Sequence, residues 1–298
     1  MAIKTVQAII NGQTTTLTLN SSTGKYEATI TAPSKSSYNQ SEHYYNVTVK
    51  ATDTAGNTTT KDASDATLGA SLKLVVKEKV APVLVFTYPT AGAYITNNKP
   101  TITWKVTDAD SGVNSSTIGI TIDSGSKITN GITKTAITGG YQCSYTPTTA
   151  LSDGSHTIKI NASDNDGNAA TQVQVQFKID TVPPTLTVSA PVDKYITNNK
   201  SLTVSGTTND ATSSPVTIKV NGTAVTVSSD GKFSTTVTLT EGSNTITVVA
   251  TDSAGKSSTI TRTVTLDTKA PTISAITLTP NPVDAGKTYV ISVTVTDQ

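Results

Sequence analysis

Apolar and polar residues alternate with a period of two in several short segments of the chain. Three of these segments, at residues 45–51, 158–162 and 246–250, run into a turn that contains Asp. The residues predicted to face inward are Tyr45, Val47, Val49 and Ala51; Ile158, Ile160 and Ala162; and Ile246, Val248 and Ala250. Such alternation is typical of a strand with one buried face, so these segments are predicted to be half-buried β-strands.

Turn signals separate the strands. Asn-Gly pairs at residues 11–12 and 221–222 favour type I′ hairpins, because both central residues of that turn need a positive φ. Residues 24–26 and 231–233 form further turns, and each ends on an aromatic residue that is expected to fill a core. Short strands at regular spacing predict an all-β chain of tandem Ig-like β-sandwich domains, arranged as an elongated rod.

Two sequence motifs recur at domain-sized intervals. Ala-Thr-Asp-x-Ala-Gly occupies residues 51–56 and 250–255, and a looser copy occupies residues 162–167. Tyr-Ile-Thr-Asn-Asn-Lys occupies residues 94–99 and 195–200, each time ahead of an alternating strand. Intervals of about a hundred residues are too long for a solenoid repeat and fit a small sandwich.

Proline-containing junctions divide the chain at residues 78–82, 180–184 and 267–271. Proline at the start of a strand removes an amide that the sheet does not need there and stiffens the junction. The predicted domains are an Ig-like domain at 1–79 that is short and lacks its first strands, Ig-like domains at 80–180 and 181–267, and a partial module at 268–298 that holds only the first two strands.

The composition excludes some classes of protein. The net charge is +1 and Arg262 is the single arginine, so no basic face for nucleic acid is expected. Cys143 is the single cysteine, which excludes an intrachain disulfide and is read as a small apolar strand residue rather than a reactive thiol. No apolar run is long enough for membrane insertion, and residues 1–10 lack the features of a secretory signal.

The combination of these motifs resembles bacterial Ig-like modules. It comprises the Ala-Pro junction, Tyr-Ile-Thr-Asn-Asn-Lys, the Asn-Gly hairpin, Gly-Lys-Phe, Glu-Gly-Ser-Asn-Thr-Ile and Ala-Thr-Asp-Ser-Ala-Gly. Residues 181–267 match the pattern best, 80–180 well and 1–79 partly. The resemblance implies a bacterial surface protein, an ancillary domain of a polysaccharide-active enzyme, or a structural protein of a tailed phage. The Met-Ala-Ile-Lys-Thr start is similar to Ig-domain proteins of phages and prophages.

The two ends of the chain are each predicted to hold part of a module. The first module has ten residues before its Asn-Gly pair, where the third has enough for two strands, and residues 269–298 align with the segment that begins at residue 80. Three interpretations remain open. The first module is a short sandwich followed by a truncated or frayed tail; or the tail pairs with an open edge of its own chain; or residues 269–298 mediate self-association by completing the first module of another copy.

Little in the sequence points to catalysis. His43 and His156 are the only histidines and have no nucleophile pattern beside them, and no zinc spacing, phosphate loop or nucleophile elbow is present. We therefore expect no enzyme, no catalytic residue and no cofactor. Exposed tyrosines such as Tyr38, Tyr44 and Tyr141 are candidates for stacking on sugars, although each also fits a sandwich edge.

Calcium is the strongest ligand candidate. Oxygen donors alternate in residues 163–168 and cluster again in residues 108–112, which resembles half of a calcium loop. The candidate ligands are Asp164, Asp166, Asn168, Asp108 and Asp110. The bidentate Glu of a full loop is missing, and Asp-Gly-Asn is also typical of a plain tight turn, so both interpretations stay open.

These observations predict a non-enzymatic structural or adhesive Ig-like repeat protein. The first expectation is a phage or prophage component on the virion surface that contacts host cell-surface glycans or proteins, contacts other virion proteins, or acts as a spacer. The alternative is an ancillary Ig-like region of a secreted bacterial adhesin or polysaccharide-active enzyme, located outside the cell or on its surface.

Overall fold

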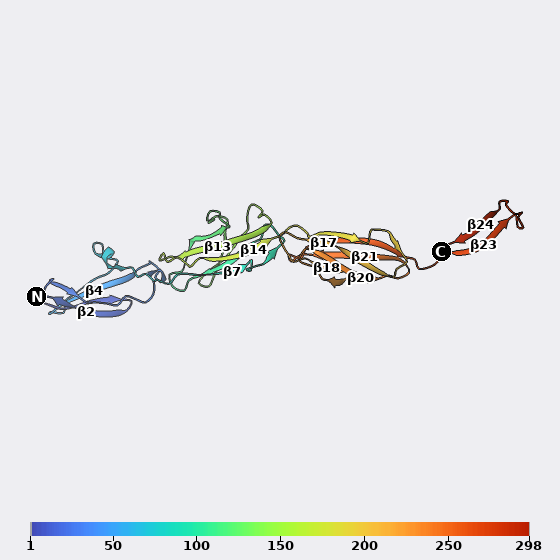
Figure 1. The fold of residues 1–298 in the computed structure, drawn as a ribbon. Coiled ribbons are helices and arrows are strands. Elements are labelled where there is room, and N and C mark those ends of the chain that lie inside the picture. Colours follow the sequence, from blue (N-terminus) through green and yellow to red (C-terminus); the bar gives the residue numbers. More distant parts are fainter. Residues whose placement is uncertain (1, 298) are drawn as a thin grey trace. The chain divides into compact units, whose positions relative to one another are not determined.

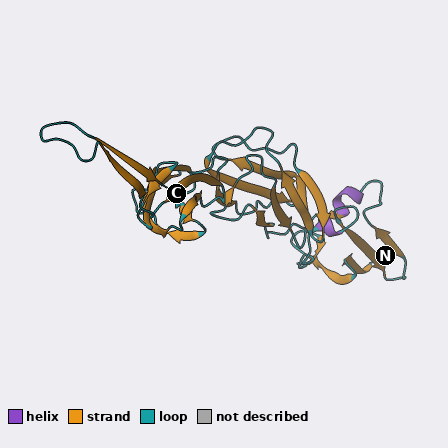
Figure 2. Ribbon diagram, turned by 90° about the vertical axis from the view of Figure 1, so that its right-hand side faces the viewer, coloured by secondary structure: helices purple, strands orange, loops and turns teal. Residues whose placement is uncertain are grey.

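The structure is a computed structural model that describes residues 2–297, and it is almost entirely β. Strands account for 53% of the chain and helices for 2%, which confirms the predicted all-β class. The helices are two short 3-10 turns, η1 (Ser37–Asn39) and η2 (Gly69–Leu72), and strands and loops make up the rest of the ribbon (Figures 1 and 2). Within the described residues, no helix has the length and apolar character needed to cross a membrane.

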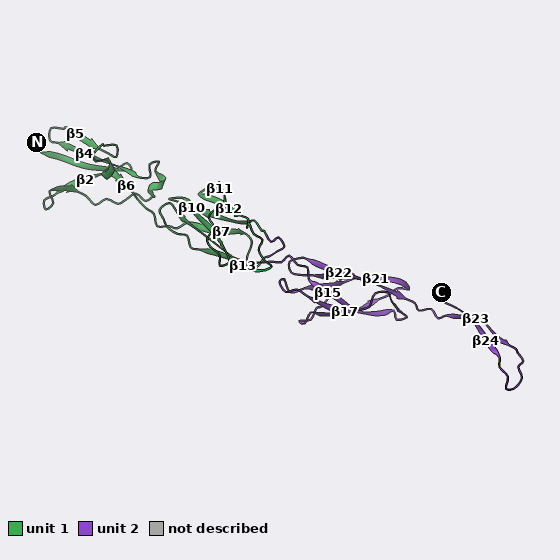
Figure 3. Ribbon diagram, turned by 90° about the horizontal axis from the view of Figure 1, so that it is seen from above, with its two compact units in different colours: residues 1–93, 99–177 green, residues 94–98, 178–298 purple. Residues whose placement is uncertain are grey.

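The chain divides into two compact units (Figure 3). Unit 1 comprises residues 1–93 and 99–177, and unit 2 comprises residues 94–98 and 178–298. Each unit holds more than one sheet.

The first module of unit 1 is a single sheet. Its strands are β1 (Ile3–Ile10), β2 (Gln13–Asn20), β3 (Lys25–Glu27), β4 (Tyr45–Asp53), β5 (Thr58–Lys61) and β6 (Lys73–Leu74). The order is β3-β2-β1-β4-β5, and β6 pairs with β4. Asn11 and Gly12 turn β1 into β2 with φ values of 48° and 73°, as the type I′ hairpin requires.

The inward face of β4 departs from the sequence prediction. Tyr45 is buried, whereas Val47, Val49 and Ala51 are only half-buried. β4 is a strand as predicted, but the expected burial of these three residues is wrong, because the described residues of this module form no second sheet over this face.

The second module has two sheets. Its strands are β7 (Val83–Tyr88), β8 (Tyr94–Ile95), β9 (Ile102–Thr107), β10 (Val113–Ile122), β11 (Thr133–Ile137), β12 (Gly140–Tyr145), β13 (Gly154–Asp164) and β14 (Val173–Ile179). One sheet has the order β11-β12-β9-β7 and the other β10-β13-β14-β8. The predicted inward residues of β13 are buried. Cys143 lies opposite Trp104 in the core, and burial raises the pKa of its thiol to about 11.

The third module, in unit 2, is the most regular sandwich. Its strands are β15 (Thr185–Ala190), β16 (Tyr195–Thr197), β17 (Ser201–Asn209), β18 (Thr217–Val220), β19 (Thr223–Val225), β20 (Lys232–Thr238), β21 (Gly242–Thr251) and β22 (Ser257–Leu266). The sheets are β15-β17-β20 and β16-β22-β21-β18-β19.

The core of the third module depends on one glycine. The predicted inward residues of β21 are buried together with Phe233. A Cβ on Gly206 would lie 2.0 Å from the Thr187 carbonyl oxygen and 2.8 Å from the Phe233 ring. Only glycine therefore lets β17 approach β15 while the Phe233 ring stays in the core.

Beyond the third module, β23 (Thr272–Thr279) and β24 (Val290–Thr296) form an isolated antiparallel hairpin. Every described residue from Thr268 to Asp297 is exposed. The hairpin pairs apolar residues with one another, for example Ile276 with Val293 and Leu278 with Ile291.

Candidate functional site

Two modules each carry a cluster of three carboxylates. In each cluster, one ligand atom from every residue lies within 4.8 Å of the other two. Cluster 1 is Glu78, Asp108 and Asp164, and cluster 2 is Asp180, Asp210 and Asp252.

The two clusters occupy equivalent positions of their modules. The first acid precedes the first strand of its module, β7 or β15. The second acid directly follows β9 or β17, and the third lies at the end of β13 or directly after β21. The cluster is therefore a repeated feature that joins the linker segment to two loops of the module that follows.

Cluster 2 is buried throughout. Asp180 is fully buried, and Asp210 and Asp252 are 8% and 6% exposed. Asp210 Oδ1 accepts hydrogen bonds from the backbone N–H groups of Thr212 (2.8 Å) and Ser213 (2.7 Å). The hydroxyl of Ser213 donates to Asp180 Oδ2.

One buried carboxylate oxygen in cluster 2 has no hydrogen-bond partner. Asp252 Oδ1 accepts a hydrogen bond from the Lys256 N–H at 2.9 Å, but the buried Asp252 Oδ2 accepts none. In cluster 1 the equivalent oxygen, Asp164 Oδ2, accepts from the side-chain amide of Asn168 at 2.7 Å. Lysine replaces that asparagine at position 256, so Asp252 loses the amide donor.

The electrostatics of cluster 2 favour a positive partner. At 4.8 Å and an effective dielectric constant of 20, each pair of ionised carboxylates repels by about 3–4 kcal/mol. Among the described residues, no lysine, arginine or histidine forms an ion pair with these acids. A divalent cation would remove the repulsion, and carboxylate oxygens are the ligands that calcium prefers.

The acids of cluster 1 are less completely buried than those of cluster 2. Asp108 and Asp164 are buried, and Glu78 is half-buried. Asp108 Oδ1 accepts from the N–H groups of Asp110 and Gly112 at 3.0 and 2.8 Å, and Glu78 Oε1 accepts from the Ser111 N–H at 2.8 Å. The buried hydroxyl of Ser111 has no partner. The same ligand types are present, but no carboxylate oxygen of cluster 1 is both buried and without a partner, as Asp252 Oδ2 is in cluster 2.

The structure brings together two of the five predicted calcium ligands, Asp108 and Asp164, and adds Glu78. Asp110, Asp166 and Asn168 make other contacts. Asp110 accepts from the Ser36 N–H at 3.1 Å, Asp166 accepts from the Glu78 N–H at 3.0 Å, and Asn168 donates to the Glu78 carbonyl at 3.2 Å. These three residues form hydrogen bonds to segments around cluster 1 and are not among its three acids.

Glu78 and all of cluster 2 were missed by sequence reasoning, although a signal exists. The first and second acids of each cluster are separated by the same thirty residues, as in Glu78–Asp108 and Asp180–Asp210. Asp267 and Asp297 repeat this spacing.

The two histidines and the candidate sugar-stacking tyrosines contact neighbouring side chains and backbone of their own modules. His156 is buried, with Nδ1 2.9 Å from Asp123 Oδ2 and Nε2 2.8 Å from the Ser152 carbonyl. The His43 ring lies 4.7 Å from the exposed Tyr38 ring, and Lys73 Nζ lies 4.7 Å from the centre of the Tyr44 ring. Tyr141 is half-buried in β12.

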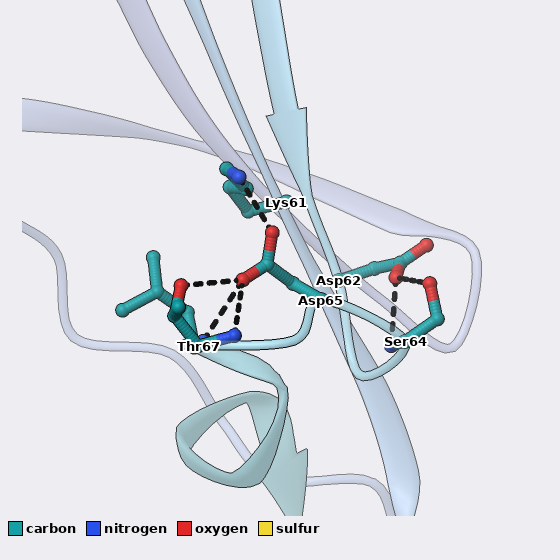
Figure 4. Close-up of polar contacts among 6 residues, drawn as sticks. Lys61, Asp62, Ser64, Asp65 and Thr67 are labelled. Carbon is teal, nitrogen blue, oxygen red and sulfur yellow. Dashed lines mark hydrogen bonds and ion pairs between the residues drawn. The ribbon is translucent and has the colours of Figure 1, made fainter.

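The loop after β5 holds two further acids, which are satisfied by local donors (Figure 4). Asp65 accepts from Lys61 Nζ at 2.5 Å and from the N–H groups of Thr67 and Leu68 at 2.9 Å. Asp62 accepts from the N–H and hydroxyl of Ser64. Since each carboxylate already has its donors, this loop has the character of a turn and not of an ion site.

Replacing Lys61 by alanine is expected to raise the pKa of Asp65. The Lys61 ammonium is the largest cause that holds this pKa well below its ordinary value of 3.8, followed by the Leu68 and Thr67 amides. A lowered folded-state pKa means that the ionised carboxylate stabilises the loop above pH 4 or so, and that this contribution is lost as the pH falls. NMR titration of the Asp65 carboxyl measures the change.

Asp230 provides the control for that titration. Lys232 lowers the pKa of Asp230 to about 2 in a different module, so the Lys61 substitution should leave it unchanged. An unaltered Asp65 titration in the Lys61→Ala variant would show that the backbone donors alone set its pKa.

Comparison with known proteins gives matches on two modules. Residues 90–181 match the family described as bacterial Ig-like domain. Residues 184–268 match the family described as glucodextranase, domain B. Bacillopeptidase F of Bacillus subtilis (strain 168) is 33% identical over 126 residues, which is 42% of this chain and 9% of the relative, so the chain spans about a tenth of that protein's length.

Solved structures of tandem modules also resemble the chain. The fibronectin(III)-like modules of Clostridium thermocellum CbhA are 18% identical, with a TM-score of 0.38 over 62% of this chain and 94% of that one. A tetra-tandem repeat from the extending region of a large adhesion protein is 21% identical, with a TM-score of 0.33 over 98% and 79%. A three-domain Ig fragment of titin is 11% identical, with a TM-score of 0.44 over 89% and 88%.

The bacterial Ig-like match of residues 90–181 and the two-sheet topology of the second and third modules show that the chain contains Ig-like modules in tandem.

Proposed function

We propose that this chain is a non-catalytic structural and adhesive array of Ig-like modules whose acidic clusters bind calcium. The observation that carries the proposal is the recurrence of a buried acidic cluster at equivalent positions of two modules. In cluster 2 the unpartnered oxygen of Asp252 is an independent sign that a ligand belongs there. Calcium fits better than magnesium, because three carboxylates of the protein meet at one point, whereas magnesium usually keeps several waters and is held by only one or two carboxylates.

The position of the cluster suggests what the ion does. Asp180 directly follows β14 and precedes β15, whereas Asp210 and Asp252 end strands inside the third module. A cation held by all three ties the linker segment to the body of that module. Such a tie reduces the freedom of the linker and suits a protein that acts as a spacer.

The proposed location is the surface of a particle or cell. A virion component of a phage or prophage that contacts host glycans or proteins is the first setting, supported by the resemblance of the repeats to such proteins. Weak contacts by one module gain strength from repetition. The second setting, an ancillary region of a secreted adhesin or polysaccharide-active enzyme, is favoured by the match of residues 184–268 to glucodextranase domain B.

Calorimetric titration of the chelator-treated protein with calcium chloride tests the proposal. The expected result is saturable binding at two sites, with weaker binding of magnesium in a parallel titration. The absence of saturable calcium binding at millimolar concentrations would overturn the calcium role. A glycan array probed with the full chain then tests adhesion, and silence on the array leaves the spacer role as the function.

A further inference from the structure

Two neighbouring cavities lie on the third module, along the sheet β15-β17-β20. Their volumes are about 430 and 530 Å³, within the range of about 300–1,000 Å³ that is typical of small-molecule sites. Ser189 lines both cavities, so they adjoin at this residue. We call the two cavities together the sheet groove.

The floor of the sheet groove is the outer face of this sheet. Leu202 and Val204 of β17 are buried in the core, so the residues that alternate with them face outward. Residues of β20 pair beside them. The hydroxyl-bearing residues that line the groove from the three strands are Ser189, Ser201, Thr203, Ser205, Thr207 and Ser234. The floor is therefore a regular array of hydroxyl groups.

A β-bulge lies where the two cavities adjoin. The register of β15 with β17 shifts between Val188 and Ala190, so Ser189 is an extra residue in β15. Bulges redirect a side chain and are frequent beside active sites. Here the bulge places Ser189 between the two halves of the sheet groove.

Tyr195 forms an aromatic wall at one end of the sheet groove. It lines the smaller cavity beside Pro191 and is 42% exposed. Asn199 lines the same cavity and adds a side-chain amide. Tyrosine combines an apolar ring with a polar hydroxyl, which suits contact with the faces and hydroxyl groups of a sugar.

A one-residue difference in register gives Tyr195 this orientation. Asp180 and Asp267 directly follow the last strands of their modules, and each donates its N–H to the end of the short strand β8 or β16. Tyr94 pairs with the residue two positions before Asp180, whereas the residue two positions before Asp267 pairs with Ile196. Ile196 therefore takes the place of Tyr94 in the fold, and Tyr195 points to the opposite side, because successive residues of a strand alternate.

The sheet groove has no unpaired charge among the described residues that line it. Lys232 is the charged side chain of this lining, and its Nζ lies 2.6 Å from Asp230 Oδ2. An anionic ligand would therefore meet no free cation. Hydroxyl groups both donate and accept hydrogen bonds, so a ligand that is itself rich in hydroxyl groups can pair with this floor in either direction.

We propose that the sheet groove binds a chain of a neutral polysaccharide, with one sugar ring stacked on Tyr195 and the following sugars hydrogen-bonded along the hydroxyl floor. The aromatic wall, the hydroxyl array and the absence of a free charge in the lining together select this class of ligand. The proposal rests on the adhesive part of the proposed function, for which it names the site and the ligand class, and it does not depend on the calcium clusters.

Affinity electrophoresis of the full chain in native gels tests the proposal. Gels that contain dextran, arabinoxylan or galactomannan supply three neutral polysaccharides, and polygalacturonate supplies an anionic one. The expected result is retardation that grows with the concentration of at least one neutral polysaccharide, with none in polygalacturonate. Tyr195→Ala is expected to raise the apparent Kd by about tenfold. The matched control, Tyr38→Ala, removes a tyrosine that is 39% exposed in the first module and should bind like the wild type.

A second variant tests the floor of the sheet groove. Thr203→Glu places a larger, charged side chain in the groove and is expected to weaken binding by about tenfold or more. Its matched control is Thr236→Glu, because Thr236 pairs with Thr203 on the same face but lines neither cavity. All of these side chains are exposed, so the Tm of the third module should stay close to the wild-type value in scanning calorimetry.

Three results would overturn the proposal. One is the absence of retardation in all three neutral polysaccharides, which leaves the spacer role of the proposed function. Another is retardation of the wild type that either Tyr195→Ala or Thr203→Glu leaves unchanged; the adhesive function then stands, but the sheet groove is not its site. The last is equal retardation in polygalacturonate, which contradicts a neutral ligand.

Discussion

Replacing Asp252 by asparagine is expected to raise the Tm of the third module in a chelator and to lower it, relative to the wild type, in calcium. The asparagine keeps the oxygen that accepts from the Lys256 N–H and removes one of three mutually repelling charges. The amide oxygen is a weaker acceptor than the carboxylate, so only part of the repulsion is relieved: we expect about 1–2 kcal/mol without an ion, or roughly 5–10 °C in Tm for a domain of this size.

In calcium, the wild type should have a higher Tm than the Asp252→Asn variant, the reverse of their order in a chelator. An ion present at a hundredfold excess over its Kd stabilises the native state by about 2.7 kcal/mol. The wild type gains this stabilisation, whereas the asparagine variant has lost a charged ligand and gains much less. Differential scanning calorimetry in EDTA and in calcium chloride measures both shifts.

Asp230→Asn is the matched control for the charge change. Asp230 is exposed in the same module, outside cluster 2, and pairs with Lys232. The Asp230→Asn substitution should change the Tm by the same amount with and without calcium. If Asp252→Asn also gave one shift in both buffers, cluster 2 would have no role in calcium binding.

Replacing Trp104 by alanine is expected to destabilise the second module by about 3–5 kcal/mol, which corresponds to a fall in Tm of roughly 15 °C or more. Trp104 is fully buried in β9 and pairs with Cys143 on the neighbouring strand β12. Truncation removes the largest side chain of this core and leaves a cavity that the surrounding strands cannot close. Differential scanning calorimetry should show a lower Tm for the transition of the second module and an unchanged Tm for that of the third module.

The Trp104→Phe variant separates the effect of lost side-chain volume on Tm from the effect of losing the indole N–H. The Trp104 Nε1 atom is buried and has no hydrogen-bond partner. Phenylalanine keeps most of the ring volume and removes this unsatisfied donor, so a much smaller fall in Tm is expected than for alanine. Equal losses in both variants would contradict the cavity explanation.

The strands were predictable because their signals are local. Alternation in β13 and β21 marks the buried face, and the Asn-Gly pair sets the turn between β1 and β2. Burial is not local. Val47 and Val49 of β4 follow the same sequence pattern as β21 but are half-buried, because the described residues of their module form no second sheet.

The acidic clusters also depend partly on local sequence and partly on tertiary contacts. Asp166 and Asn168 alternate with Asp164 in one loop, which predicts calcium ligands, yet the Asn168 N–H donates to Asp164 Oδ1 at 2.8 Å, as in an ordinary tight turn. Glu78 joins Asp108 and Asp164 from a separate segment of the chain, so only the folded module brings the three together. The repeated thirty-residue spacing is the sequence signal that links Glu78 to Asp108 and Asp180 to Asp210.

The parallel pairing of β16 with β22 has a mechanical consequence. Tyr195 pairs with Val264 and Thr197 with Leu266, so a strand near the start of the third module runs beside the strand that ends it. Force applied to the two ends pulls these strands in opposite directions along their length. Their hydrogen bonds are then loaded together in shear instead of opening one after another, so the third module should yield abruptly under tension.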